Sequence, residues 1–288
     1  MKKNLFITQH CSIHREQKSL KIVTDEESST IPLSIIENLF VIGNSVKLTN
    51  GARGLLLENN KNIFFYTSSY KMQGVLSNTK LQSNYRNRLI QYEASKTIPL
   101  DVAKYIVYRK ISAIKRHFDI RVDRYLSKVH DAKTISELLG YEGIVSNKMF
   151  ARFKKHLYYY DIKDFQKREY RPTKDRVNGL LSFTYTLYSN LLYGLVLSEG
   201  YDPYIGFLHQ KRGTHYAFVS DLIEYDRAKL TLFVAKLLSG EHITDAHFDG
   251  IYLNREGRKA FLTHFNTMCQ HAFEISRQNL FNIGEQLV

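Results

Sequence analysis

The sequence predicts an α+β fold, with a small β-rich N-terminal domain over residues 1–75 and a larger, mainly α-helical domain over residues 76–288. Two observations support this fold class. Short apolar runs separated by polar breaks occupy the first third of the chain, as in the strands of a small sheet. From Leu81 onward, apolar residues recur at spacings of three and four, the period of a helix with one buried face. A length of 288 residues with 43% hydrophobic residues is enough for real cores.

Four apolar runs predict the strands of the N-terminal domain: residues 4–8, 19–24, 35–42 and 62–66. Between the last two runs, Thr49 or Asn50 can cap a short helix that ends at Asn59 and Asn60. The segment 67–79 is polar, contains Gly74 and shows no sustained period. It therefore predicts the connection between the two domains.

Six segments with helical spacing follow: residues 81–94, 100–129, 135–159, 177–199, 216–239 and 255–282. We expect the second to break near Asp119 and an irregular segment over 247–257 to separate the last two. The stretch 177–198 carries no charge and is nearly long enough to cross a bilayer. Its many Asn, Ser, Thr and Tyr residues favour a buried helix of a soluble core, with no membrane partner.

The composition predicts a cytoplasmic protein with a polyanionic partner. The formal charge is +13 and the pI is about 9.5, which most often indicates binding to nucleic acid. Cys11 and Cys269 lie far apart without metal-ligand spacing, so neither a disulfide framework nor a structural zinc site is implied. The first apolar run is interrupted by polar residues and lacks the core of a signal peptide.

Two acidic residues three positions apart are the first candidates for a functional site. On a helix, Asp221 and Glu224 would point to the same side and could face one cation or one phosphate. Arg227 lies three residues after Glu224, so a solvated ion pair between these two side chains explains the same sequence pattern. Both interpretations stay open on these residues alone.

His209 and Glu142 are further candidates, each with an ordinary alternative. His209 follows Gly206, Phe207 and Leu208 in an apolar segment, and an isolated histidine is more often a core or surface residue. Glu142 lies at the expected start of a helix, where capping and the helix dipole also favour a carboxylate. Two carboxylates and one imidazole would suit Mg²⁺ or Mn²⁺.

The segment 150–176 interleaves basic side chains with aromatic ones and could follow phosphates and stack on unpaired bases. The alternative is an amphipathic, solvated helix with its aromatic residues in the core. The candidate DNA-binding residues are Arg152, Lys155, Arg171 and, after His209, Arg212. The loop 241–249 contains a rival set of metal-binding side chains, for which we prefer an ordinary surface loop. This set consists of His242, Asp245, His247 and Asp249.

Four blocks in order resemble the CRISPR-associated protein one family, the integrase of CRISPR adaptation. They are Glu142-Gly143, the RPTKDRVNGLLSFTYTLY segment over 171–188, the Gly-Phe-Leu-His segment ending at His209, and the Asp-Leu-Ile-Glu segment ending at Glu224. The resemblance extends over the full length. Asp226 and Ala228 depart from it, because the family often has Phe and Pro there.

The resemblance implies that Glu142, His209 and Glu224 bind a catalytic Mg²⁺ or Mn²⁺ ion. Asp221 would be a supporting catalytic acid that accepts a proton or orients a water molecule, and Arg212 would hold a phosphate. The implied reaction is metal-dependent DNA integration and endonuclease cleavage, in which a 3′-hydroxyl attacks a phosphodiester.

The resemblance also implies partners: prespacer DNA, the leader end of the repeat array, and a small companion adaptation protein. Residues 1–75 would form a homodimer, and residues 76–288 would be the catalytic domain. Two alternatives remain from the sequence. They are a non-catalytic DNA-binding scaffold, which would tolerate loss of Glu142, and a transposon-associated integrase relative with the same ion site.

Overall fold

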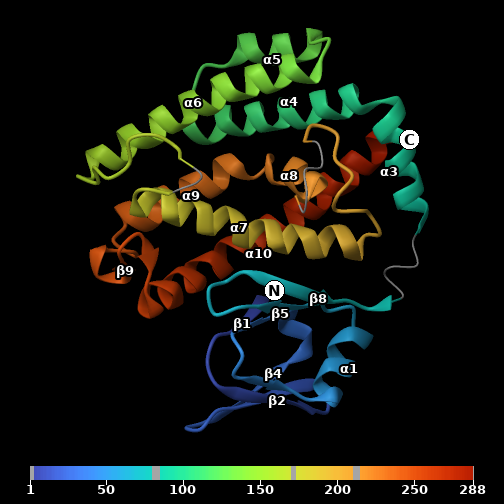
Figure 1. Cartoon of the computed structure of the whole chain (residues 1–288), viewed down its shortest axis with the longest axis vertical. Helices are drawn as coiled ribbons and strands as arrows, with labels where there is room; N and C mark the ends of the chain where they lie inside the picture. Colours follow the sequence, from blue (N-terminus) through green and yellow to red (C-terminus); the bar gives the residue numbers. More distant parts are fainter. Residues whose placement is uncertain (1–2, 80–84, 170–172, 210–214, 288) are drawn as a thin grey trace. The chain divides into compact units, whose positions relative to one another are not determined.

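The computed structural model describes residues 3–79, 85–169, 173–209 and 215–287. The chain divides into two compact units, Met1–Tyr85 with Leu197–Gly200 and Arg86–Val196 with Tyr201–Val288. The first unit is rich in strands and the second is helical (Figure 1), so the predicted α+β class is confirmed. The division falls after Tyr85, compared with the sequence-based boundary at residue 75.

The described strands of the first unit form two four-stranded sheets. The first sheet has the order β1-β5-β7-β8, with bounds β1 Lys3–Ile7, β5 Ile36–Ile42, β7 Ile63–Tyr66 and β8 Met72–Leu76. The second sheet has the order β4-β3-β2-β6, with bounds β2 Cys11–Glu16, β3 Ser19–Val23, β4 Ser28–Pro32 and β6 Val46–Leu48. Both sheets are mixed. In the first, β5 pairs in parallel with β1 and β7, and β7–β8 is antiparallel. In the second, β2 pairs in parallel with β6, and β2–β3 and β3–β4 are antiparallel.

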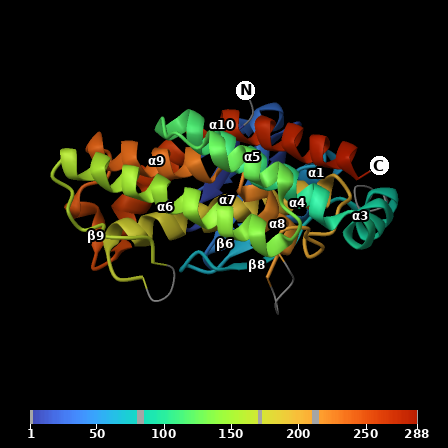
Figure 2. The same ribbon diagram turned by 90° about the horizontal axis from the view of Figure 1, so that it is seen from above.

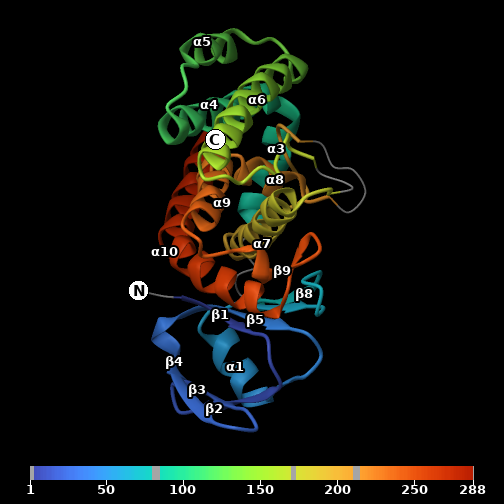
Figure 3. The ribbon, with the colours of Figure 1, turned by 90° about the vertical axis from the view of Figure 1, so that its left-hand side faces the viewer.

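One apolar core joins these sheets and helix α1, Asn50–Glu58. Figure 3 shows α1 between the strands of the two sheets. The members of this core alternate along β2 and β3, as the pairs Cys11 and Ile13, and Leu20 and Ile22, illustrate, because successive strand residues face opposite sides of a sheet. Helix α1 contributes Ala52 and Leu56 to the same core. Its N-cap is the predicted Thr49, whose hydroxyl accepts a hydrogen bond from the Ala52 amide at 3.4 Å.

The predicted strands correspond to β1, β3, β5 and β7, but the sequence did not predict β2, β4, β6 and β8. Strand β8 lies inside the segment that was assigned to the domain connection, so that part of the prediction is wrong. The reason is that β8 is an edge strand whose residues are only partly buried or exposed, so it shows little apolar alternation.

The helical unit is built from α3 to α10. Their bounds are α3 Tyr85–Thr97, α4 Pro99–Phe118, α5 Asp123–Asp131, α6 Ile135–Tyr159, α7 Arg176–Ser198, α8 Ala217–Ile223, α9 Arg227–Ser239 and α10 Arg255–Gln286. Helices α4, α6 and α9 pack against one another, and α5 covers α4 and α6 (Figures 1 and 2). Helix α10 contacts α8 and α9. A short hairpin of β9, Phe248–Asp249, and β10, Tyr252–Leu253, precedes α10.

Helix breaks decide where the candidate residues lie. The predicted break near Asp119 is confirmed, because this residue ends α4 in the left-handed conformation with φ 49°. The segment 216–239, predicted as one helix, is two, since α8 ends at Ile223 and α9 begins at Arg227. Helix α6 begins at Ile135, and its N-cap Thr134 accepts a hydrogen bond from the Glu137 amide at 3.2 Å.

The apolar stretch is helix α7. Its length and composition would allow it to cross a membrane, since an 18-residue stretch of it has a mean hydropathy of 1.3. However, 67% of that stretch is buried within the protein. Tyr188 and Leu192 illustrate this burial, with no exposed surface. The helix is therefore part of the core, as predicted.

Candidate metal centre

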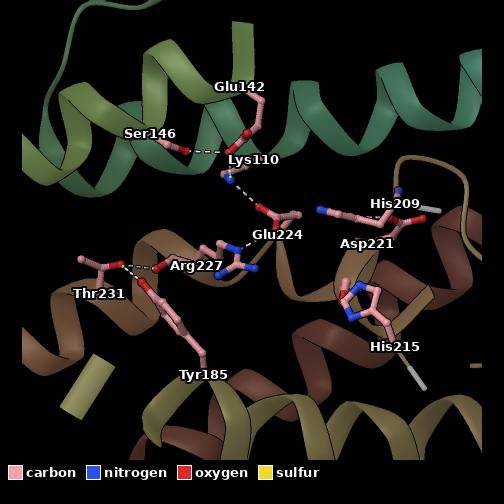
Figure 4. A network of polar contacts seen from close by, with 11 residues as sticks. Lys110, Glu142, Ser146, Tyr185, His209, His215, Asp221, Glu224, Arg227 and Thr231 are labelled. Atoms are coloured by element: carbon pink, nitrogen blue, oxygen red, sulfur yellow. Dashed lines mark hydrogen bonds and ion pairs between the residues drawn. The ribbon is translucent and has the colours of Figure 1, made fainter. Parts of the chain in front are cut away.

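Glu142 and Glu224 converge on one cationic group, the ammonium of Lys110 (Figure 4). The three side chains come from different elements: Lys110 from α4, Glu142 from α6, and Glu224 from the residue that follows α8. The Lys110 Nζ contacts Glu142 Oε1 on one side and Glu224 Oε2 on the other. Two carboxylates that are 82 positions apart in the chain thus face one positive charge.

Glu224 is almost completely buried, with 3% of its side chain exposed. The Arg227 Nε donates a hydrogen bond to its Oε1 at 2.6 Å. Its Oε2 contacts the Lys110 ammonium, but no described group donates to this oxygen a hydrogen bond of acceptable geometry. Burial opposes the charge of Glu224, yet Arg227, Lys110 and His209 outweigh it and lower the pKa to about 2. The expected ion pair with Arg227 exists, but it is buried and not solvated.

Glu142 lies two turns inside α6, so the expectation that it stands at a helix start is wrong. Capping therefore does not explain this carboxylate. Its Oε1 accepts a hydrogen bond from the Ser146 hydroxyl at 2.7 Å, one turn further along the helix, and contacts Lys110. Among the described residues, no group makes a hydrogen bond or ion pair with its Oε2. With 20% of the side chain exposed, this oxygen can take part in a further interaction.

Asp221 orients His209. Its carboxylate is fully buried and accepts four hydrogen bonds, which are the number that two carboxylate oxygens accommodate. Three come from the amides of Phe207, Leu208 and His209 at 2.6, 3.1 and 2.9 Å, and the fourth joins its Oδ1 to His209 Nδ1 at 2.7 Å. A carboxylate with this set of donors has no acceptor position left for a water molecule or a substrate proton.

The hydrogen bond to Asp221 determines which nitrogen of His209 is available. Because Asp221 accepts at Nδ1, the proton of the neutral imidazole lies there and the Nε2 lone pair stays open. The ring extends from Asp221 toward Glu224 (Figure 4), and Nε2 makes no hydrogen bond with a described residue. Burial lowers the pKa of His209, but the hydrogen bond and charge of Asp221 and the charge of Glu224 raise it above its usual value.

Gly206 is required for this arrangement, because a Cβ at this position would lie 2.6 Å from the carbonyl oxygen of His209. The same Cβ would lie 2.9 Å from the Cβ of Ala217 at the start of α8. Only glycine allows the 206–209 segment to approach α8 this closely, and that approach brings three amides to Asp221.

Arg227 is held by an aromatic ring on α7. The guanidiniums of Arg227 and Arg168 lie 5.0 and 5.6 Å from the centroid of the Tyr185 ring. The Tyr185 hydroxyl shares a hydrogen bond of 2.6 Å with Thr231 on α9. These contacts fix the cation that pairs with Glu224 and add positive charge around it.

Lys110 was not singled out in the sequence analysis. A signal was present: apolar residues on α4 recur at helical spacing, and the lysine stands within this buried stripe. The buried residues of α4 are Val102, Ala103, Ile106, Val107, Lys110, Ile111, Ile114 and Phe118. A lysine among apolar core positions predicts a buried acidic partner.

The remaining candidates lie elsewhere. Arg152 and Lys155 are exposed on α6, roughly three to four turns beyond Glu142. Arg171 and Arg212 lie outside the described residues.

The rival set in the 241–249 loop is engaged separately. His247 pairs with Thr244, Asp245 pairs with Arg176 at 2.6 Å, and the His242 ring stacks on His264. Neither in this loop nor elsewhere in residues 3–79, 85–169, 173–209 and 215–287 are three His, Cys, Asp or Glu side chains close enough together to hold a metal ion as they stand.

The same finding applies to Glu142, His209 and Glu224, which do not form a closed cluster in the described part of the chain. Their chemistry nevertheless fits a divalent cation. Glu142 and Glu224 already face one positive group, Glu224 Oε2 is buried without a hydrogen bond, and His209 Nε2 is open. Two hard oxygens and one imidazole nitrogen match the preferences of Mg²⁺ and Mn²⁺.

Two curated relatives are similar over most of both chains. The CRISPR-associated endonuclease Cas1 1 of Thermodesulfovibrio yellowstonii is 29% identical, with 91% of this chain and 89% of the relative covered. The CRISPR-associated endonuclease Cas1 of Nanoarchaeum equitans is 30% identical, with 92% and 86% covered.

Solved structures share the fold. A Cas1 protein from Thermotoga maritima has a TM-score of 0.82 at 21% identity, with 99% of this chain and 96% of that chain covered. A casposase bound to its integration product has a TM-score of 0.76 at 22% identity, with 92% and 82% covered. A chain of a Cas6-RT-Cas1–Cas2 complex has a TM-score of 0.74 at 22% identity, with 99% of this chain but 35% of that longer chain covered. The family model of CRISPR associated protein Cas1 matches residues 5–267, and with this match over nearly the whole length the chain belongs to that family.

Proposed function

We propose that this protein is a divalent-metal-dependent DNA strand transferase and endonuclease of CRISPR adaptation, which inserts prespacer DNA into the repeat array. The observation that carries the proposal is the convergence of Glu142 and Glu224 on one cationic group, beside the open Nε2 of His209. The names of the relatives agree, since two are endonucleases and one fold neighbour is a casposase bound to its integration product.

Glu142, His209 and Glu224 would hold Mg²⁺ or Mn²⁺. When bound, the ion would neutralise a non-bridging phosphate oxygen and polarise the attacking hydroxyl. Asp221 would position His209 and hold the proton of the neutral imidazole on Nδ1, so that Nε2 faces the ion, in place of the proton-accepting role expected from the sequence. Arg227 would keep Glu224 ionised at neutral pH, which a metal ligand requires.

In the proposed reaction, the 3′-hydroxyl of prespacer DNA attacks a phosphorus atom of the repeat DNA. One phosphorus–oxygen bond forms and the bond to the repeat's 3′-oxygen breaks, so no external energy source is needed. The attacking hydroxyl loses its proton to solvent and the departing oxygen gains one. In the endonuclease reaction, water takes the place of the attacking hydroxyl. Arg212 remains a proposed phosphate contact.

The proposed partners are DNA, a second copy of the chain and a small companion adaptation protein in the cytoplasm. The complex of a Cas1-containing chain with Cas2 supports the companion protein, and the charge of +13 supports DNA. Residues 1–75 would form the homodimer contact and residues 76–288 would carry catalysis. A non-catalytic scaffold would not require a buried, doubly paired Glu224 next to an oriented histidine.

The test is integration of a labelled prespacer into a supercoiled plasmid that carries the repeat, with Mn²⁺ or Mg²⁺ and the companion protein. We expect Glu142→Gln and Glu224→Gln to abolish the product. Glu137→Gln is the matched control, since Glu137 lies on the same helix and its carboxylate caps the Lys133 amide at the exposed start. Equal product from wild type and both site variants would overturn the proposal.

A plasmid without the repeat distinguishes the two kinds of strand transferase. An adaptation integrase should require the repeat. Equal insertion into both plasmids, still dependent on Glu142, would favour the transposon-associated alternative, which the likeness to a casposase keeps open.

A further inference from the structure

Lys110 is a buried lysine with 3% of its side chain exposed, and its position on α4 belongs to the apolar stripe of that helix. Lysine is almost never buried this deeply unless it is paired, because removal of its charge from water is costly. An apolar side chain at this position would continue the stripe without a buried charge of its own. The charge of Lys110 therefore serves the two acids that it touches.

Those two acids depend on Lys110 to different degrees. Glu224 keeps a second cation in Arg227, which donates to the other carboxylate oxygen. Glu142 has only the neutral hydroxyl of Ser146 besides Lys110 among the described residues. Without the ammonium, Glu142 and Glu224 would face each other across the site as like charges.

The charges of the four side chains that meet at Lys110 and Glu224 sum to zero, and the buried carboxylate of Asp221 lies next to them beside His209. Glu142 and Glu224 contribute two negative charges, and Lys110 and Arg227 contribute two positive ones. A divalent cation that enters this group meets less attraction than two unpaired glutamates would provide, and it meets the Lys110 ammonium at the place where both carboxylates are within reach. The arrival of a DNA phosphate, or the withdrawal of the lysine, would make the group negative and favour the ion.

We propose that Lys110 is a positioning residue that acts as a built-in cation: it holds Glu142 and Glu224 together while no metal is bound and competes with the divalent ion for them. The inference rests on the proposed metal site. The flexible four-carbon side chain of Lys110 allows the ammonium to leave the carboxylates when the ion enters. The protein thereby binds its ion weakly until DNA supplies compensating negative charge, and a metal-loaded site away from DNA is avoided.

The test measures Mn²⁺ binding to the full-length, DNA-free chain by the loss of the free-ion signal in electron paramagnetic resonance. Lys110→Met should bind Mn²⁺ at least about tenfold more tightly than wild type, because one positive charge has been removed from the site. Lys110→Arg retains the charge and should restore weak binding. The control is Lys115→Met on the same helix, since Lys115 pairs with Asp123 at an exposed position and should leave the affinity unchanged.

A second readout follows the apo protein. In EDTA, Lys110→Met should melt at a lower temperature than wild type, and saturating Mn²⁺ should raise its melting temperature by more than it raises that of wild type. If Lys110→Met does not fold, Lys110→Gln takes its place, because its amide still donates to a carboxylate, and the same tighter binding is required of it.

Each protein is also measured with Glu142→Gln added. The Mn²⁺ binding that this substitution removes is the site-dependent binding. Site-dependent Mn²⁺ binding by Lys110→Met or Lys110→Gln that is equal to or weaker than that of wild type would overturn the inference and leave the proposed function standing. No site-dependent binding in any variant, with or without a short DNA duplex, would overturn the proposed metal site and the inference with it.

Discussion

Replacement of Asp221 by asparagine tests whether this residue positions His209 or takes part directly in catalysis. The carboxylate accepts four hydrogen bonds while fully buried. An amide keeps one acceptor oxygen, so its nitrogen must face two of the four donors. If the oxygen faces the amides of Phe207 and Leu208, the nitrogen faces the His209 amide and Nδ1. The NH₂ group then donates to Nδ1, moves the imidazole proton to Nε2 and removes the lone pair that would bind the ion.

The magnitude follows from these contacts. The His209 amide and the second N–H of the new side-chain amide would face each other without an acceptor. Two such buried donors cost about 1–3 kcal/mol each, so Asp221→Asn should lower the free energy of unfolding by about 4 kcal/mol. Loss of the partner that orients a metal-binding histidine should weaken Mn²⁺ binding by about 10- to 100-fold. Urea unfolding followed by circular dichroism and Mn²⁺ titration measure the two effects separately. The control is Asp123→Asn, because Asp123 is an exposed acid on α5 and its replacement should change neither quantity measurably.

A direct catalytic role for Asp221 makes the opposite prediction. Integration would fall sharply in Asp221→Asn, while the free energy of unfolding and the Mn²⁺ affinity would stay at wild-type values. That combination would refute the positioning role.

Three further outcomes are expected. Gly206→Ala should destabilise the protein by about 3 kcal/mol and weaken Mn²⁺ binding, because its Cβ would lie 2.6 Å from the His209 carbonyl oxygen. Asp226→Asn should be at least as stable as wild type at pH 7 in urea unfolding. Burial raises the pKa of Asp226 above its usual value, so the contribution of this acid is full below about pH 3.9 and is lost as the pH rises through the folded pKa. Replacement of both Arg152 and Lys155 by glutamine should weaken duplex binding and lower the slope of log affinity against log salt by about 2.

Each of these has a defined contrary result. For Gly206→Ala, it is unchanged stability together with unchanged Mn²⁺ affinity. For Asp226→Asn, it is a loss of stability at pH 7, or an advantage that does not shrink as the pH is lowered from 7 toward 4. For the double variant of Arg152 and Lys155, it is a salt slope equal to that of wild type, which would exclude this face of α6 from DNA binding.

Much of the fold could be predicted because its signals are local. Alternating or continuous apolar runs identified β1, β3, β5 and β7, and helical spacing identified the long helices, including the buried α7. Edge strands such as β8 were missed because a strand with no fully buried residue carries little apolar alternation. The break between α8 and α9 was missed because residues 224–226 continue the helical spacing, and nothing in the sequence marks the interruption.

The order of the motif residues along the sequence was not enough to assign their roles at the site. Asp221 and Glu224 are three residues apart, so their spacing allowed them to face one cation or one phosphate together. Because α8 ends at Ile223, Asp221 turns to the 206–209 segment, whereas Glu224 faces Lys110 and Arg227. The two acids therefore differ in their contacts, although their spacing in the sequence suggested one task.

The sequence by itself determined the α+β class, the positive charge and the candidates Glu142, His209 and Glu224, because these depend on composition, on periodicity and on motifs a few residues long. Only the tertiary structure decided that Lys110 lies between the two glutamates. It also decided that all four hydrogen bonds accepted by Asp221 come from His209 and the two residues before it. The physical reason is that a contact between α4, α6 and the end of α8 joins residues 32 and 114 positions apart. Such a contact depends on how helices pack, and no local pattern records it.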